Sequence, residues 1–212
     1  LLKHNLSRFS GTMEGHGGKW YYYIPVSLLV FMPASGWYLT NFKHVKFKGM
    51  PAFDLWCWSW FVVIFVFFSL SKTQLPHYLL YGATPIFILM SKYREKLRYP
   101  LLIALPSLLM LLALALLKPI SEYLIATSHD DVLVAMLNDG LIHISVAYQL
   151  ITAAALLVIL FLCFVKTIPL WQRQLISCTL FSLTFVFQIM PVYAAIQQGP
   201  VVAAAKFSES LS

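Results

Sequence analysis

Hydrophobic residues dominate this chain in long runs that are separated by short polar connections. A helix that crosses about 30 Å of hydrocarbon needs roughly 20 predominantly apolar residues, and six runs approach that length. We therefore predict an all-α membrane protein, a polytopic bundle with about six transmembrane helices in residues 20–192. The predicted spans are Trp20–Leu39, Leu55–Leu70, Pro76–Met90, Pro100–Leu117, Ile142–Val165 and Leu175–Val192.

The polar connections between these runs alternate in charge. Nine of the fifteen Lys and Arg residues follow the first, third and fifth spans, and the positive-inside rule places these connections in the cytoplasm. They are Lys43, Lys46, Lys48, Lys92, Arg94, Lys96, Arg98, Lys166 and Arg173. Near them, Asp54 is predicted to cap the second helix. Residues 1–19, the turn Ser71–Leu75, the loop Lys118–Leu141 and the tail 193–212 then face outward, and the tail suggests the start of a further domain.

Composition agrees with a membrane setting. Hydrophobic residues make up 60% of the chain and charged residues 11%, and the mean hydropathy is +0.77. The net charge of +7 does not indicate a nucleic-acid partner, because the basic residues are spread among short connections. Three cysteines lie inside apolar runs and are interpreted as small buried hydrophobes. The chain begins with Leu1 and shows no signal-peptide pattern, so we expect it to be a piece of a larger protein.

The segment between the second and third spans contains the most distinctive chemistry. Lys72 lies among hydroxyl side chains, and ionisable residues in membrane segments are costly and usually functional. Pro76 suits the first turn of a helix, whose free amides would point toward the lysine. This combination predicts a phosphate site, although a lysine that extends its stem to the interface would explain Lys72 alone. The hydroxyl residues are Ser69, Ser71, Thr73 and Tyr78.

Residues 1–19 supply further cations on the same predicted side. Arg8 could grip a phosphate with two hydrogen bonds, and His4 could support it. The alternative is a solvated loop that leads into an aromatic interface belt beginning at Trp20. His77 and Tyr78 could equally be residues of such a belt. In the loop Lys118–Leu141, three aspartates could hold a divalent metal, but a solvated acidic loop is the simpler interpretation.

Three stretches resemble bacterial membrane glycosyltransferases of the protein O-mannosyltransferase superfamily, and most of all the lipid A aminoarabinose transferase group. The stretches are HNLSRF, GHGGKWYYYIPV and FFSLSKTQLPHYLL. Family members carry a Ser-x-x-Lys-Leu-Pro-x-Tyr turn. Here Gln74 stands where relatives commonly have a second lysine, which makes Lys72 the more important cation. The resemblance is strongest over residues 1–90.

The resemblance implies a GT-C-type enzyme of which this chain is a C-terminal fragment. Such enzymes reside in the bacterial cytoplasmic membrane and move a sugar from a polyprenyl-phosphate donor to a lipid or protein acceptor on the extracytoplasmic face. By analogy, Arg8, Lys72 and Tyr78 would hold the donor phosphate, with support from His4, Thr73 and His77. The family's catalytic acidic residue matches no position here, so we expect no catalytic residue in this fragment.

Two other functions fit a polytopic chain with interrupted helices. A transporter of lipid-linked sugars would be expected to show internal repeats and charges near the middle of its spans, and the sequence shows neither. A non-catalytic scaffold subunit would also lack a catalytic acid. A divalent metal and the identity of the sugar are left open by the sequence.

Overall fold

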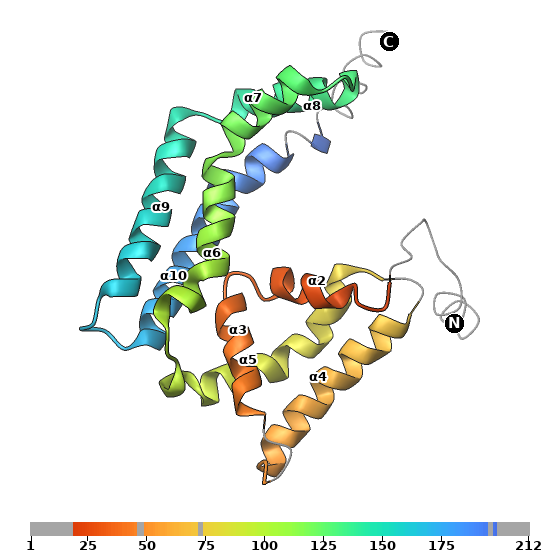
Figure 1. The fold of residues 1–212 in the computed structure, drawn as a ribbon, viewed down its shortest axis with the longest axis vertical. Coiled ribbons are helices and arrows are strands. Elements are labelled where there is room, and N and C mark those ends of the chain that lie inside the picture. The colour runs from red at the N-terminus through yellow and green to blue at the C-terminus, as the bar shows by residue number, and fades with distance from the viewer. Residues whose placement is uncertain (1–18, 46–48, 72–73, 195–196, 199–212) are drawn as a thin grey trace, which may run out of the picture. The chain divides into compact units, whose positions relative to one another are not determined.

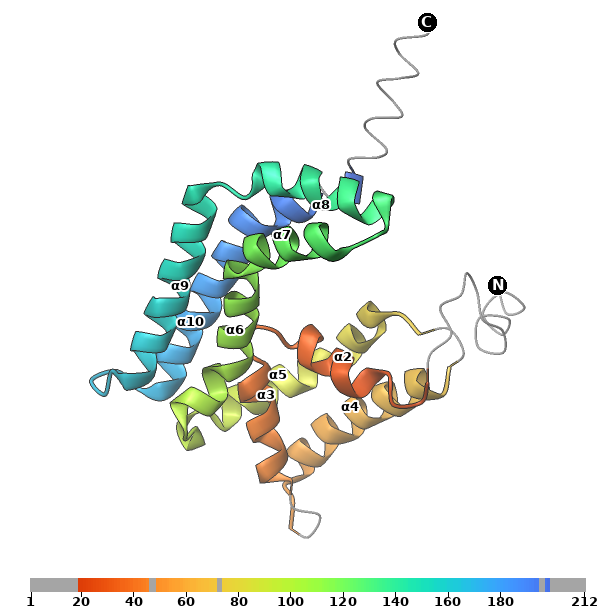
Figure 2. The same cartoon turned by 45° about the horizontal axis from the view of Figure 1, so that its top comes forward.

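The computed structural model describes residues 19–45, 49–71, 74–194 and 197–198, and all regular elements in these residues are helical. The chain divides into two compact units, and each is described by itself. Unit 1 comprises residues 1–106 and 166–174, and unit 2 comprises residues 107–165 and 175–212. Figures 1 and 2 show the helices from two directions.

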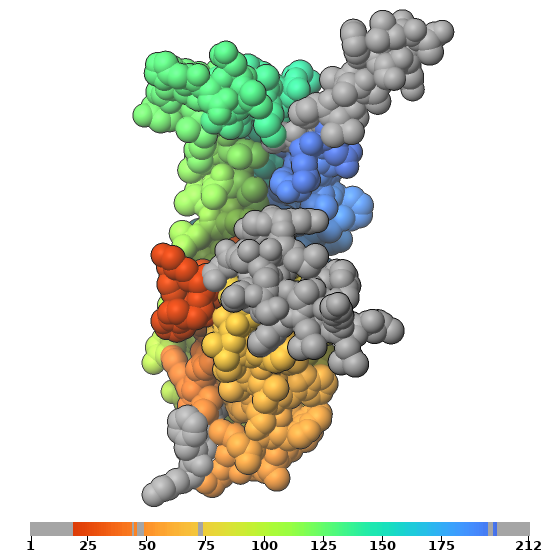
Figure 3. Space-filling model, turned by 90° about the vertical axis from the view of Figure 1, so that its right-hand side faces the viewer, coloured from red at the N-terminus to blue at the C-terminus, as the bar shows by residue number. Residues whose placement is uncertain are grey.

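Unit 1 is built around five helical segments that pack on one another. Helix α4 packs against both η2 and α5, while α2 contacts η2 and α3 contacts α5. On the face that Figure 3 shows, the orange-to-yellow atoms of α4 form much of the visible surface of unit 1. The elements are α2 (Tyr23–Val30), α3 (Ser35–Asn41), η1 (Phe42–His44), α4 (Ala52–Leu70), η2 (Pro76–Gly82), α5 (Ala83–Lys92), η3 (Arg94–Lys96) and the start of α6 (Pro100–Ala115).

The core of unit 1 is strongly aromatic. The rings of Phe31 and Tyr38 stack with their centroids 4.1 Å apart, and Phe61 of α4 approaches both. Gly36 allows α3 to approach the beginning of α6 closely, because a Cβ atom at that position would lie 2.0 Å from the backbone oxygen of Ile103. Small residues at helix contacts serve the same purpose in membrane bundles.

Unit 2 contains the rest of α6 and four more helices. They are α7 (Leu117–Thr127), α8 (Asp131–His143), α9 (Val146–Phe164) and, from residue 175 onward, α10 (Leu170–Thr184), which continues into the π-helix η4 (Phe185–Ile189). A buried cluster of Ile144, Tyr148, Ile189 and Val192 joins α9 to η4 and the residues after it. The Tyr148 hydroxyl donates a hydrogen bond to the Leu114 carbonyl 3.1 Å away, which ties α9 to α6.

Three helices are long and apolar enough to cross a membrane: Ala52–Leu70, Val146–Phe164 and Leu170–Ala194. They confirm the predicted second, fifth and sixth spans as helices, with ends shifted by up to five residues. The fourth predicted span corresponds to α6, which together with α7 qualifies as one more candidate span bent by 54°. Within the described residues, the structure therefore supports three such helices, or four if the bent pair is a single span.

The other two predicted spans are not continuous helices. Trp20–Leu39 contains α2 and α3, which are separated around Pro33, because proline lacks the amide that would continue the helix. The Ser35 hydroxyl instead donates to the Leu28 carbonyl at 2.5 Å. Pro76–Met90 begins as a 3₁₀-helix and becomes α-helical only from Ala83. A count of six membrane spans therefore remains a prediction.

The prediction of a loop over Lys118–Leu141 is wrong. Most of this segment folds into α7 and α8, which pack against each other. Asp130 separates the two helices and caps α8. Its carboxylate accepts hydrogen bonds from the amides of Val132 and Leu133 at 3.0 and 3.2 Å. Asp130, one of the three aspartates that raised the alternative of a metal site, thus has a structural role as a helix cap.

Candidate functional site

The turn between α4 and η2 is the place where the sequence predicts a phosphate site. Two hydrogen bonds fix its end. The Gln74 side-chain amide donates to the Ser69 carbonyl at 3.0 Å, and the Tyr23 hydroxyl of α2 donates to the Leu75 carbonyl at 2.9 Å. Pro76 then begins η2, as the sequence predicts, but with 3₁₀ rather than α-helical geometry. The structure therefore holds the chain on the C-terminal side of the turn in a defined place.

Tyr78 lies beside this turn in an aromatic cluster. Its half-buried ring stacks on Phe68 of α4, with centroids 4.6 Å apart and an interplanar angle of 25°. The exposed His77 ring meets Tyr78 edge-on at 4.7 Å. Because the Tyr78 ring is held against α4, its position relative to the end of that helix is set by packing. The described structure thus brings Tyr78 and His77 together next to the turn.

The other four predicted site residues lie outside the described residues. They are His4, Arg8, Lys72 and Thr73. Their assignment to a phosphate site remains a prediction from the sequence.

Two buried polar atoms at the turn have no hydrogen-bond partner within the described residues: the Gln74 side-chain oxygen and the Ser69 hydroxyl oxygen. A buried polar atom without a hydrogen-bond partner typically lowers stability by about 1–3 kcal/mol. A water or a ligand group that donates a hydrogen bond to either oxygen would remove this penalty. The resemblance places Gln74 where relatives commonly have a second lysine. The structure adds that this residue is buried and holds the end of α4.

Asp54 does not cap the second helix, contrary to the prediction. Pro51 occupies the N-cap position, and the carboxylate of Asp54 accepts hydrogen bonds from Lys92 and Tyr93 at the other end of α5. The Lys92 ammonium lies 2.5 Å from the carboxylate. Only 2% of the Asp54 side chain is exposed, compared with 39% for Lys92. A buried carboxylate needs a partner. Hydropathy alone could not show that the partner of Asp54 is Lys92, which lies 38 residues further along the chain.

Tyr93 completes this cluster. Its hydrogen bond to the carboxylate of Asp54, together with burial, raises the pKa of Tyr93 to about 12. The phenol consequently stays protonated over the whole range in which an enzyme would work. This arrangement fastens the start of α4 to the end of α5 and is a structural contact.

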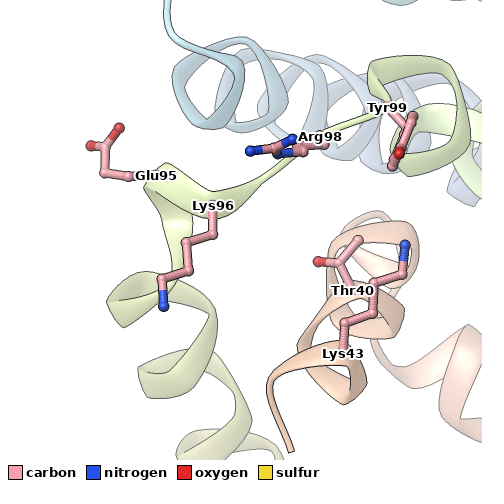
Figure 4. Close-up of a pocket in the computed structure, with 6 residues that line it drawn as sticks. All are labelled: Thr40, Lys43, Glu95, Lys96, Arg98 and Tyr99. Carbon is pink, nitrogen blue, oxygen red and sulfur yellow. The ribbon is translucent and has the colours of Figure 1, made fainter.

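A second polar feature lies in unit 1, at the ends of α3 and α5 and the start of α6. Six of the described residues line a half-open cavity of about 500 Å³, and we call it the basic pocket. Figure 4 shows Lys43 extending toward the ring of Tyr99, whereas the carboxylate of Glu95 points away from Lys43. The ammonium of Lys43 lies 5.4 Å from the centre of the Tyr99 ring. The lining residues are Thr40, Lys43, Glu95, Lys96, Arg98 and Tyr99.

From the sequence alone, the cations of this pocket indicate only which side of the membrane is cytoplasmic. Lys43 follows the first predicted span, and Lys96 and Arg98 follow the third. Their convergence on one cavity depends on the packing of α3 against α5, which no local pattern reveals. Among the described residues, no group of three or more His, Cys, Asp or Glu side chains is placed to hold a metal ion.

These features define a class: a helical protein with membrane-spanning helices and a polar turn beside an aromatic cluster. No protein-family model matches the chain. The undecaprenyl phosphate-alpha-4-amino-4-deoxy-L-arabinose arabinosyl transferase 2 of Proteus mirabilis is 40% identical over 92 residues, which are 42% of this chain and 16% of that protein. The corresponding transferase of Wigglesworthia glossinidia brevipalpis is 30% identical over 93 residues, 43% of this chain and 16% of that protein.

A solved structure extends the similarity to nearly the whole chain. The crystal structure of ArnT from Cupriavidus metallidurans bound to undecaprenyl phosphate superposes with a TM-score of 0.59 and 18% sequence identity, over 96% of this chain and 36% of that one. This likeness establishes the fold. The sequence matches show that the chain is homologous, over about two fifths of its length, to part of the undecaprenyl phosphate aminoarabinosyl transferases. The chain spans about a sixth of the length of the curated transferases that it matches.

Proposed function

We propose that this chain is part of an integral-membrane glycosyltransferase that takes a sugar from a polyprenyl-phosphate donor on the extracytoplasmic face of a bacterial cytoplasmic membrane. The turn between α4 and η2 would bind the donor phosphate, through Lys72 in the turn and Tyr78 beside it. Arg8 would be the second cation. The names of the similar transferases favour an amino-deoxy-arabinose as the sugar. The acceptor would be a lipid or a protein.

The observation that carries this proposal is the way the turn is held. Hydrogen bonds from Gln74 and Tyr23 fix its C-terminal side, and the stack on Phe68 places Tyr78 beside it. A phosphate site needs donors whose positions are set before the ligand arrives, because reorganisation would reduce their effect. The oxygens of Ser69 and Gln74, which have no hydrogen-bond partner within the described residues, add two acceptors for a protonated ligand group or a bridging water.

The proposed chemistry concerns the leaving group. When the bond between the sugar and the phosphate breaks, negative charge grows on the phosphate oxygens. A lysine ammonium, an arginine guanidinium and a phenol hydroxyl all donate hydrogen bonds to such oxygens and would stabilise this charge. The group that activates the acceptor matches no residue of this chain. We therefore expect residues 1–212 alone to bind donor but not to transfer sugar.

The replacement Lys72→Ala in the complete enzyme tests the proposal. Removing one donor that faces a developing charge typically lowers kcat by 10²–10³, so we expect a rate about 100-fold lower with an undecaprenyl-phosphate-linked sugar. Tyr78→Phe, which removes only a neutral donor, should have a smaller effect. Transfer can be followed by mass spectrometry of the acceptor.

Lys118→Ala is the matched control, because Lys118 lies in α7 and is also predicted to face outward. Its activity should stay within about twofold of wild type, as expected for a charge that contacts neither substrate nor transition state. If Lys72→Ala transferred sugar at the wild-type rate, the phosphate-site assignment would be wrong.

A further inference from the structure

We infer that the basic pocket is a binding site for the headgroup of an anionic phospholipid, separate from the proposed donor site. Among the described residues, three cations and one acidic side chain line the pocket. The acidic side chain, Glu95, lies 3.5 Å from the Nε atom of Arg94, and the Lys96 ammonium lies 4.8 Å from the centre of the Tyr93 ring and points away from Lys43 (Figure 4). Lys43 and Arg98 are therefore the two cations that the site would use. The pocket volume of about 500 Å³ falls within the range of roughly 300–1,000 Å³ that is typical of small-molecule sites. This inference does not depend on the proposed glycosyltransferase activity.

Arg98 supplies the strongest recognition element. Within the part of the chain that the structure describes, no hydrogen bond or ion pair of its guanidinium group is found. A guanidinium presents two parallel N–H donors that match two oxygens of a phosphate. Lys43 contributes a second charge from a segment 55 residues earlier in the chain. Its ammonium contacts the Tyr99 ring rather than a carboxylate.

The backbone at Tyr99 brings these groups together. Tyr99 has a φ of 62°, a left-handed conformation that is unfavourable for a non-glycine residue. This turn lies between η3 and α6 and allows Arg98 and Tyr99 to line the same cavity. The Tyr99 ring is 64% exposed, although a ring of this size gains free energy when it is covered. Local strain of this kind tends to persist where a site needs it.

The basic pocket and the proposed donor turn lie at opposite ends of unit 1. Helix α4 has 19 residues and runs from the Asp54 end to the turn, a length of about 28 Å at 1.5 Å per residue. Asp54 pairs with Lys92 at the far end of α5, and the basic pocket is lined by residues that follow Lys92. A ligand in the basic pocket would therefore be about one hydrocarbon thickness away from the turn.

An apolar groove beside the pocket favours a lipid over a soluble phosphate compound. Leu39 and Phe42 line this groove of about 360 Å³, and they alternate along the chain with Thr40 and Lys43 of the basic pocket. The same short stretch thus offers charge on one side and apolar surface on the other. An anionic phospholipid has both parts, a phosphate for the cations and an acyl chain for the groove. Basic pockets between membrane helices bind acidic lipid headgroups in this way.

Competition binding on the purified chain in phosphatidylcholine micelles tests the inference. The probe is short-chain phosphatidylglycerol, and bound lipid is counted by native mass spectrometry. The wild-type chain should bind phosphatidylglycerol in preference to phosphatidylcholine. Each cation near an acidic headgroup contributes an amount that corresponds to about a fivefold change in affinity. Lys43→Gln and Arg98→Gln should each weaken binding by about that factor, and the double variant by about 25-fold.

Lys166→Gln is the matched control, since it removes an exposed lysine of unit 1 that does not line the pocket. It should change phosphatidylglycerol affinity less than about twofold. Circular dichroism and thermal unfolding should be the same for the control and the double variant. The wild-type lipid preference needs no variant at all, so the inference can be tested even if a variant fails to fold.

Three results would overturn the inference. One is equal binding of phosphatidylglycerol and phosphatidylcholine by the wild-type chain. Another is a double variant that binds phosphatidylglycerol as tightly as Lys166→Gln. The third is displacement of phosphatidylglycerol by inorganic phosphate at equal concentration, which would identify a site for soluble phosphates that ignores the acyl chain.

Discussion

Removing Lys92 should destabilise unit 1 more than removing Asp54, although the two side chains form one ion pair. Lys92→Ala leaves the carboxylate of Asp54 buried, with 2% of its side chain exposed and, among the described residues, Tyr93 as its remaining hydrogen-bonding side chain. Breaking a buried pair in this way costs about 3–5 kcal/mol. Asp54→Ala leaves an ammonium whose side chain is 39% exposed. Water can solvate that charge, so we expect a loss of only about 1–2 kcal/mol.

The double variant sharpens this prediction. Once Lys92 is absent, removing Asp54 also removes the uncompensated buried charge. The variant lacking both residues should therefore be more stable than Lys92→Ala alone, by roughly 1–3 kcal/mol. The free energy of unfolding can be measured by titrating the chain from mild micelles into dodecyl sulfate while its helix content is recorded.

The reasoning would be refuted by either of two results. Asp54→Ala could destabilise the chain as much as Lys92→Ala, or the second replacement could add to the first. Either result would mean that water reaches the carboxylate or that the pair contributes through packing rather than charge. Glu95→Ala, which removes an exposed carboxylate outside the cluster, should stay within about 0.5 kcal/mol of wild type.

Three further predictions concern packing, ionisation and capping. Gly36→Ala would place a Cβ atom 2.0 Å from the Ile103 backbone oxygen and should cost about 1–3 kcal/mol or more, whereas Gly82→Ala, which meets only side-chain atoms at 3.3 Å, should cost less in the same unfolding titration. Equal midpoints for the two variants would contradict this. The pKa of Tyr93 is raised to about 12, so its hydrogen bond stabilises the fold fully below pH 10 and the contribution disappears as pH rises through 12. Tyr93→Phe should therefore flatten the alkaline fall in unfolding free energy, and an unchanged pH profile would exclude the bond. Asp130→Ala removes the N-cap of α8 and should cost about 1 kcal/mol, measured against Asp131→Ala. Indistinguishable stabilities would show that the cap contributes little.

The candidate donor site was partly predictable from sequence. A lysine, several hydroxyls and a Leu-Pro step between two apolar runs are visible as neighbours in the chain, and the aromatic residue next to them is Tyr78. The bonds that hold the turn were not visible. Tyr23 reaches Leu75 across 52 residues, and only the packing of α2 against η2 places them together.

Much of the helical framework followed from the sequence alone. Hydropathy over a window of membrane length located α4, α6, α9 and α10, because burial in hydrocarbon is a property of each residue and adds along a run. The same window could not show that the helix breaks around Pro33, that residues 76–82 form a 3₁₀-helix, or that the residues around Asp130 form two helices. Those outcomes depend on local hydrogen bonding, to which an averaged hydropathy is insensitive.

Tertiary structure decided the partners of the charges. The sequence identified Asp54, Lys92, Lys43 and Arg98 as polar positions at helix ends and grouped the basic ones on one predicted side. It could not show that Asp54 is buried against Lys92 while Lys43 and Arg98 line a cavity. A charge in a medium of low dielectric is stable only where a partner lies within a few ångströms, and such distances between remote segments exist only once the helices have packed.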